Sequence, residues 1–143
     1  MLHKLLRTSN DQLPRRSVEE IKLSPIRLTD NDLVYSGLVT MATVGNTRSY
    51  GGGMEVCPKA DHHDGLLDLS LLTNFDRVKM LRNMSSVAAG TWWKLDGAKM
   101  FRGEKIRIEM LALTAYADGD PFFGTPIECS VAPDAGYYIV PRP

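Results

Sequence analysis

Short runs in which polar and apolar residues alternate, each bounded by a turn sequence, constrain this chain more than any other feature. Residues 20–28 and 106–110 alternate in this way, which is typical of strands with one buried face. Pro25 interrupts the first run and predicts an edge position or a bulge, because proline cannot donate a backbone hydrogen bond. The largely apolar segment 33–44 is short enough for a buried strand. The Asp118-Gly119 pair predicts a hairpin turn.

One segment has helical periodicity instead. Its apolar positions recur every three or four residues, and its Arg and Lys residues are expected on the other face; the apolar positions are Phe75, Val78, Leu81, Met84 or Ser85, and Ala88. Thr73 or Asn74 can cap the start, and Gly90 can end it. Further strands are predicted over 66–72, 127–131 and 137–140. The pattern therefore predicts a mainly β chain: an antiparallel two-layer β-sandwich with one short α-helix at about residues 75–89. An α+β domain with one sheet is the alternative.

Composition narrows the classes of function. The 143 residues suit one domain, and 17 Lys+Arg balance 17 Asp+Glu. A neutral chain gives no support for a nucleic-acid-binding face or a polybasic membrane patch. Two cysteines make no disulfide framework, and reduced thiols favour a cytosolic protein. Residues 1–14 are interpreted as the end of a helix or an artificial fragment boundary, and the domain is expected over 15–143.

Residues 60–68 gather three carboxylates and two imidazoles around an Asp64-Gly65 turn. A carboxylate beside free carbonyl oxygens can hold a hard cation such as Mg²⁺. A solvated hairpin turn explains the same residues without a metal. His62-His63 raises zinc as a third interpretation, but adjacent residues of an extended segment point to opposite sides.

A second acidic turn lies at residues 116–121. Asp118-Gly119 alone is an ordinary hairpin turn, but a further acid follows it at Asp120. A carboxylate on a rigid turn can accept the proton of a substrate hydroxyl. Trp92-Trp93 is expected to divide between the core and the surface, with a lipid-facing role open to one of them. The glycine-rich segment 45–54 is either a loop or a bulge, or a place of close backbone approach.

Taken in order, several of these motifs resemble the second domain of diacylglycerol kinase- and sphingosine kinase-like lipid kinases, from about residue 33 to residue 143. The motifs are Gly45-Asn46, Gly51-Gly52-Gly53-Met54, Pro58, Asp64-Gly65-Leu66-Leu67-Asp68, Asp118-Gly119-Asp120-Pro121, Pro126, and Val131 to Pro141 with prolines at 133 and 141.

This resemblance implies a fold, a reaction and a set of site residues. Members have two domains with ATP bound between them, and the second is a β-sandwich. They transfer the γ-phosphoryl group of ATP to a lipid hydroxyl. Carried over, Asp64 supplies a carboxylate to Mg²⁺, and Asp61 and Leu66 supply main-chain carbonyls. Asp120 becomes the proton acceptor, at a place where many members have Glu.

The family's Gly-Gly-Asp-Gly-Thr-type nucleotide loop does not occur in this sequence. The chain is therefore expected to be the acceptor-side domain without its nucleotide-binding domain, inactive alone, with diacylglycerol converted to phosphatidic acid as the first candidate reaction. Expected partners are the lipid substrate, ATP, a membrane surface touched peripherally from the cytoplasm, and a second copy, but no nucleic acid. The alternative is a non-catalytic β-sandwich module for lipid binding or oligomerisation. A metal-dependent hydrolase built on His62-His63 is a third hypothesis.

Overall fold

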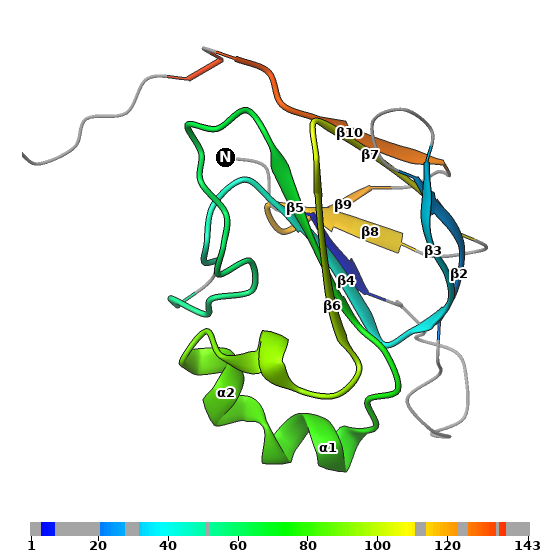
Figure 1. Ribbon diagram of the computed structural model, residues 1–143, viewed down its shortest axis with the longest axis vertical. Coiled ribbons are helices and arrows are strands. Elements are labelled where there is room, and N and C mark those ends of the chain that lie inside the picture. The colour runs from blue at the N-terminus through cyan, green and yellow to red at the C-terminus, as the bar shows by residue number, and fades with distance from the viewer. Residues whose placement is uncertain are drawn as a thin grey trace, which may run out of the picture.

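Two antiparallel sheets form the architecture of the chain (Figure 1). The computed structural model describes residues 4–7, 21–27, 32–50, 52–110, 114–122, 126–133 and 135–136. Within these residues, the six-stranded sheet has the order β6-β5-β4-β1-β8-β9, and the four-stranded sheet has the order β10-β7-β2-β3. The strands of the first sheet are β1 (Lys4–Arg7), β4 (Met41–Gly45), β5 (Leu67–Leu72), β6 (Ala98–Gly103), β8 (Thr114–Ala117) and β9 (Asp120–Phe122). Those of the second are β2 (Ile21–Arg27), β3 (Leu33–Val39), β7 (Lys105–Met110) and β10 (Ile127–Ser130).

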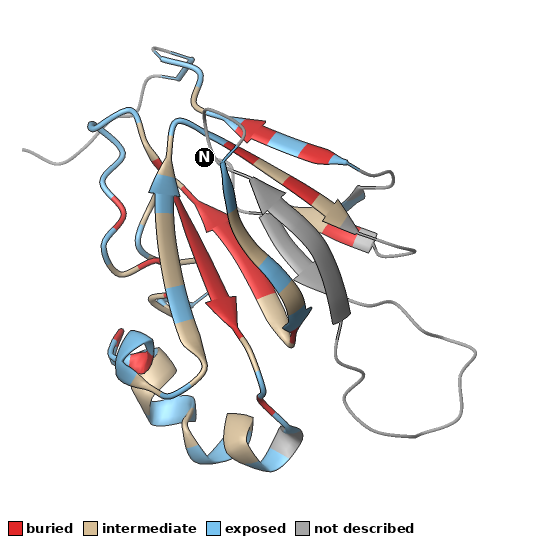
Figure 2. Ribbon diagram, turned by 45° about the vertical axis from the view of Figure 1, so that its right-hand side comes forward, coloured by how far each residue is buried: buried red, intermediate tan, exposed pale blue. Residues whose placement is uncertain are grey.

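The main core lies between the two sheets. Both contribute alternate residues to it, as expected when the inner faces of two sheets pack together. Its buried members are Val39, Ala42, Val44, Leu67, Leu69, Leu71, Ile106, Ile108, Ala115, Ile127 and Cys129. Figure 2 shows this burial concentrated in the strands. The predicted mainly β, antiparallel sandwich is thereby confirmed.

The outer face of the six-stranded sheet is covered as well, which explains why every residue of β5 is buried. A helical layer covers one end of this face through a second core around Leu72, Phe75 and Trp92. The segment that joins β4 to β5 covers the other end through Val56, Cys57 and Ala60.

The predicted single helix at 75–89 is two short helices, α1 (Arg77–Arg82) and α2 (Met84–Ala88), joined at Asn83 and followed by the 3₁₀ turn η1 (Trp92–Lys94). Neither Thr73 nor Asn74 caps the first helix. Asp76 does so, since its side chain accepts a hydrogen bond from the Lys79 amide at 2.7 Å. Asn74 has a φ of 59°, a left-handed conformation outside the helix.

The segment 33–44, predicted as one buried strand, is two strands in different sheets. The chain leaves β3 and enters β4 at Thr40, whose amide donates to the Leu72 carbonyl at 2.7 Å. The Thr40 hydroxyl also donates to the Phe75 carbonyl at 3.0 Å. These long-range bonds fix a corner that the apolar pattern does not show.

Two further predictions change at the ends of the chain. Residues 4–7 form a strand, not the end of a helix, because they pair with both β4 and β8. The sandwich therefore includes residues before the expected boundary at 15. The predicted strand 137–140 lies outside the described residues. The irregularity expected at Pro25 is confirmed by a register shift between Leu23 and Ile26.

Candidate functional site

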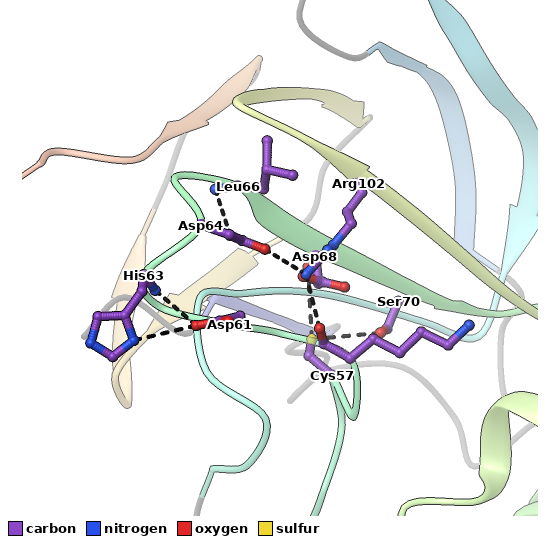
Figure 3. Close-up of polar contacts among 9 residues, drawn as sticks. Cys57, Asp61, His63, Asp64, Leu66, Asp68, Ser70 and Arg102 are labelled. Atoms are coloured by element: carbon purple, nitrogen blue, oxygen red, sulfur yellow. Dashed lines mark hydrogen bonds and ion pairs between the residues drawn. The ribbon is translucent and has the colours of Figure 1, made fainter.

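The acidic turn before β5 is built from two consecutive side-chain-to-backbone turns. Asp61 Oδ1 accepts a hydrogen bond from the His63 amide at 3.0 Å, and Asp64 Oδ1 accepts one from the Leu66 amide at 2.9 Å. In each case an aspartate bonds the backbone two residues ahead, which mimics a backbone turn. The His63 amide also lowers the pKa of Asp61. The turn thus delivers the chain into β5 with its two carboxylates held in place (Figure 3).

Arg102 links this turn to the sheet. It lies directly opposite Asp68 in the pairing of β6 with β5. Its guanidinium donates to Asp68 Oδ2 through Nε at 3.2 Å and Nη2 at 3.0 Å, and Nη2 also reaches Asp64 Oδ2 at 2.9 Å (Figure 3). The same nitrogen donates to the Lys59 carbonyl at 2.8 Å. We call Arg102, Asp64, Asp68 and the Lys59 carbonyl the Arg102 cluster.

The buried member of the Arg102 cluster is Asp68, which is only 2% exposed. A buried carboxylate is costly unless a charge and hydrogen bonds compensate it. Arg102 supplies both, and this bonding raises the pKa of Arg102. The arginine therefore ties the acidic turn, the start of β5 and the end of β6 into one unit.

Replacing Arg102 with leucine is expected to destabilise the chain by about 2–3 kcal/mol. Breaking a fully buried pair costs about 3–5 kcal/mol, and the value is reduced here because the guanidinium is 40% exposed. Thermal unfolding followed by circular dichroism measures the loss. The matched control is Arg107→Leu, since Arg107 pairs with Glu109 and Glu128, whose side chains are 41% and 42% exposed, so a much smaller change is expected. Equal losses in the two variants would contradict the role assigned to the buried Asp68.

The expected Mg²⁺ ligands sit in this turn, and their chemistry fits a hard cation. Asp64 offers a carboxylate, and the main-chain oxygens of Asp61 and Leu66 belong to the same short segment. Both Asp64 oxygens already have a protein partner, namely the Leu66 amide and the Arg102 guanidinium. A cation bound to Asp64 would therefore share that carboxylate with Arg102 or displace it.

The sequence predicts that His62 and His63 point to opposite sides, as adjacent residues of an extended segment do. In the structure they do not. Their ring centroids lie 3.8 Å apart. Together with Asp61 they offer three ligand atoms within 4.8 Å of one another, and all three residues are exposed. The expectation was wrong because residues 62–65 form a turn, where the alternation of an extended strand does not apply.

Cys57 is buried beside β5, next to the acidic turn. Its sulfur lies 3.5 Å from the Ser70 hydroxyl oxygen and 3.7 Å from the Asp68 carbonyl oxygen (Figure 3). Burial raises the pKa of this thiol to about 11, so it stays protonated at neutral pH and is no nucleophile. Gly45 must be glycine here, because a Cβ would come within 2.9 Å of the Cys57 sulfur. Cys57 and Cys129 are both free thiols, as predicted.

Asp120 lies at the same end of the six-stranded sheet as the acidic turn. It is the first residue of β9, after a hairpin in which Asp118 has a φ of 51°. The registers align Ala117 with Lys4, Lys4 with Val44, and Val44 with Leu69, one residue from Asp68. Strands β5 and β9 are four positions apart in this sheet, about 19 Å at the usual spacing.

The same registers place Asp120 and the Arg102 cluster on opposite faces of the sheet. Asp120 pairs with Ala117, on the face that carries Val44 and Ala115. Asp68 and Arg102 project from the other face, where Cys57 and Ser70 lie. The two acidic turns thus share one end of the sheet but do not contact each other directly.

Comparison with known proteins identifies the family to which the chain is similar. The family model described as "YegS C-terminal NAD kinase beta sandwich-like domain" matches residues 16–139. A "Diacylglycerol kinase" of Mycobacterium tuberculosis (strain CDC 1551 / Oshkosh) is 40% identical over 104 residues, which are 73% of this chain and 34% of that protein. A "Probable lipid kinase YegS-like" of Pectobacterium atrosepticum is 31% identical over 114 residues, which are 77% and 36%. The chain spans about a third of the length of these relatives.

The fold also has a solved counterpart. The crystal structure of a diacylglycerol kinase from Bacillus anthracis superimposes with a TM-score of 0.58 at 18% identity, covering 89% of this chain and 48% of that one. At this identity the likeness shows a shared fold, so the residue roles still have to be argued from this chain's own geometry.

Proposed function

This chain belongs to the family of YegS C-terminal NAD kinase beta sandwich-like domains, and from that membership we propose that it is the acceptor-side domain of an ATP-dependent lipid kinase. The relatives named above carry the names diacylglycerol kinase and lipid kinase. In the proposed reaction a lipid hydroxyl attacks the γ-phosphorus of ATP, the bond to the β-phosphate oxygen breaks, and ADP leaves. Diacylglycerol is the first candidate acceptor, with phosphatidic acid as its product.

The observation that carries the proposal is that two acidic turns lie at the same end of a single sheet. The turns come from residues 61–66 and 118–120, more than fifty residues apart in the chain, and the registers of four strands bring them together. Phosphoryl transfer needs positioned groups and neutralised charge rather than covalent chemistry by the protein. A rigid sheet end that carries a proton acceptor and a cation-holding carboxylate meets that need.

We assign the roles as follows. Asp120 accepts the proton of the acceptor hydroxyl as that oxygen attacks. Asp64, with the main-chain oxygens of Asp61 and Leu66, would hold Mg²⁺, which would neutralise phosphate charge. ATP would be bound mainly by a nucleotide-binding domain that this chain does not contain. Because the turns lie on opposite faces of the sheet, the reactants would extend across its end, over β4, β1 and β8.

No helix within the described residues is long and apolar enough to cross a bilayer. We propose peripheral contact with a membrane from the cytoplasm, because a diacylglycerol acceptor resides in the bilayer while ATP is dissolved in the cytoplasm. A homodimer remains part of the proposal through the exposed edge strands β9 and β3 of the two sheets.

The test is a pair of assays with ATP, Mg²⁺ and dioctanoylglycerol. The 143-residue chain alone is expected to show no turnover, because it spans only about a third of the length of the lipid kinase relatives. A chimera in which this chain replaces the matching segment of the Mycobacterium tuberculosis diacylglycerol kinase is expected to produce phosphatidic acid. A folded chimera that binds ATP but phosphorylates no lipid would favour the non-catalytic module. Turnover by the isolated chain would contradict the proposed division of labour.

A further inference from the structure

The helical layer exposes an apolar stripe. Val78, Leu81 and Met84 follow one another at intervals of three residues and are 62%, 74% and 44% exposed. Val78 and Leu81 share one side of α1, and Met84 is the first residue of α2, directly after Asn83. Among the described residues, six large hydrophobic side chains are exposed, and four of them lie between residues 78 and 93. The outer helices therefore concentrate the exposed apolar surface of this part of the chain.

The apolar stripe is not the side of the helices that holds them to the sheet. Met80 and Val87 pack on the buried cluster of Leu72, Phe75 and Trp92. The sequence pattern placed Val78, Leu81 and Met84 on one apolar face of the helix, and these residues lie outside the contact with the sheet. The helices are thus anchored to the sheet on one side and expose these apolar side chains on another.

The charge around the apolar stripe differs from that of the whole chain. Residues 75–99 contain five basic side chains and two acidic ones, a net charge of +3, so the rest of the neutral chain carries −3. In the same layer Trp93 is 38% exposed, with the ammonium groups of Lys59 and Lys94 lying 4.7 and 5.3 Å from the centre of its ring. The overall balance conceals this local excess of positive charge.

We propose that the outer face of α1, α2 and η1 docks on an anionic membrane surface. Exposed aliphatic side chains, an exposed aromatic side chain and surrounding basic residues are the features by which short helices lie in a bilayer interface. Anionic lipid head groups attract the basic residues of the layer, and the apolar stripe inserts into the acyl region of the bilayer. The inference rests on the proposed function, because a kinase acting on a bilayer lipid has to approach the bilayer.

Co-sedimentation of the 143-residue chain with vesicles tests the docking, without ATP or substrate. The chain is expected to bind vesicles of phosphatidylglycerol and phosphatidylcholine more tightly than vesicles of phosphatidylcholine alone, and less tightly as salt is raised. The double variant Val78→Ser, Leu81→Ser is expected to lose at least tenfold in affinity. The matched control is Leu33→Ser, Leu38→Ser, since these side chains are 55% and 43% exposed on β3. It is expected to bind like the unchanged chain.

A second variant examines the charge separately. Arg82→Glu with Lys94→Glu reverses two exposed charges of the layer and is expected to abolish the preference for phosphatidylglycerol at low salt. Circular dichroism should show that all variants keep their fold, because the substituted side chains are exposed. Absence of vesicle binding, or equal loss in the serine variants of the stripe and of β3, would overturn the proposal. So would a dimer in analytical ultracentrifugation that only the Val78, Leu81 variant dissociates, since a second copy would then cover the stripe.

These outcomes separate the docking surface from the kinase activity. A chimera that phosphorylates dioctanoylglycerol dispersed in detergent, while the chain fails to bind vesicles, refutes the docking surface and leaves the kinase in place. Vesicle binding that depends on the stripe, with an inactive chimera, refutes the kinase and leaves a membrane-binding module.

Discussion

The substitution Gly97→Ala is expected to destabilise the chain by about 3–4 kcal/mol. A Cβ at Gly97 would lie 2.2 Å from the Thr73 carbonyl oxygen, a backbone atom that cannot rotate away. The backbone there has a φ of +89°, which costs an L-residue about 1–2 kcal/mol. Relieving the clash would also strain two hydrogen bonds to the Gly97 carbonyl, from the Thr73 amide at 2.7 Å and hydroxyl at 2.9 Å, each worth about 1 kcal/mol.

The control is Gly52→Ala. Gly52 has a φ of +72°, but a Cβ there would meet nothing within 4 Å. It therefore reports the conformational cost alone, about 1–2 kcal/mol. Urea unfolding of both variants measures the difference. Equal losses of stability in the two variants would show that the contact between residues 73 and 97 does not hold together the start and the end of the helical segment between β5 and β6.

Several strands of this fold could be predicted from the sequence, but some junctions between elements could not. Local strand patterns predicted β2, β5, β7 and β10 and the sandwich class, because residues near in sequence set the period of a strand. The break at Thr40 was not predictable, since it depends on bonds to Leu72 and Phe75, more than thirty residues away. Which helical residues are buried was not predictable for a related reason. Periodicity marks an apolar side, but only packing decides which part of it meets the sheet.

The residues of the candidate site also divide into those that the sequence predicted and those that it did not. The turn at Asp64 and the hairpin at Asp118-Gly119 follow from local residue chemistry, and both sets of acidic residues were identified in the sequence. Arg102 was missed, because it lies 34 residues from Asp68 in a strand that was not predicted, and no spacing signal connects them. The Asp68 at the end of the 64–68 motif was the only available clue, since a charged residue within an apolar strand calls for a partner.

Asparagine at position 120 is expected to lower the kcat of the chimeric kinase by about 10²–10⁴-fold, the usual contribution of a general base. The carboxamide has nearly the shape of the carboxylate but cannot take the proton of the acceptor hydroxyl. Asp120 is exposed at the start of β9, so the fold and the thermal midpoint should not change. Initial rates with dioctanoylglycerol at saturating ATP and Mg²⁺ measure the effect, with KM for the lipid expected to stay within a few-fold.

Two companion variants distinguish a proton acceptor from a structural acid in the same hairpin. Asp120→Glu keeps a carboxylate one methylene further out, the side chain found at this place in many members of the resembling family, and should retain activity within about tenfold of the unchanged chimera, because the proton transfer itself is preserved. Asp118→Asn removes the neighbouring charge while tolerating the left-handed backbone at φ 51°, and should leave kcat nearly unchanged. A loss of only a few-fold in Asp120→Asn, or the same loss in Asp118→Asn, would remove Asp120 from the chemistry. Phosphoryl transfer would then depend on positioning and charge neutralisation alone, which the turn at Asp64 and the nucleotide-binding domain would have to supply.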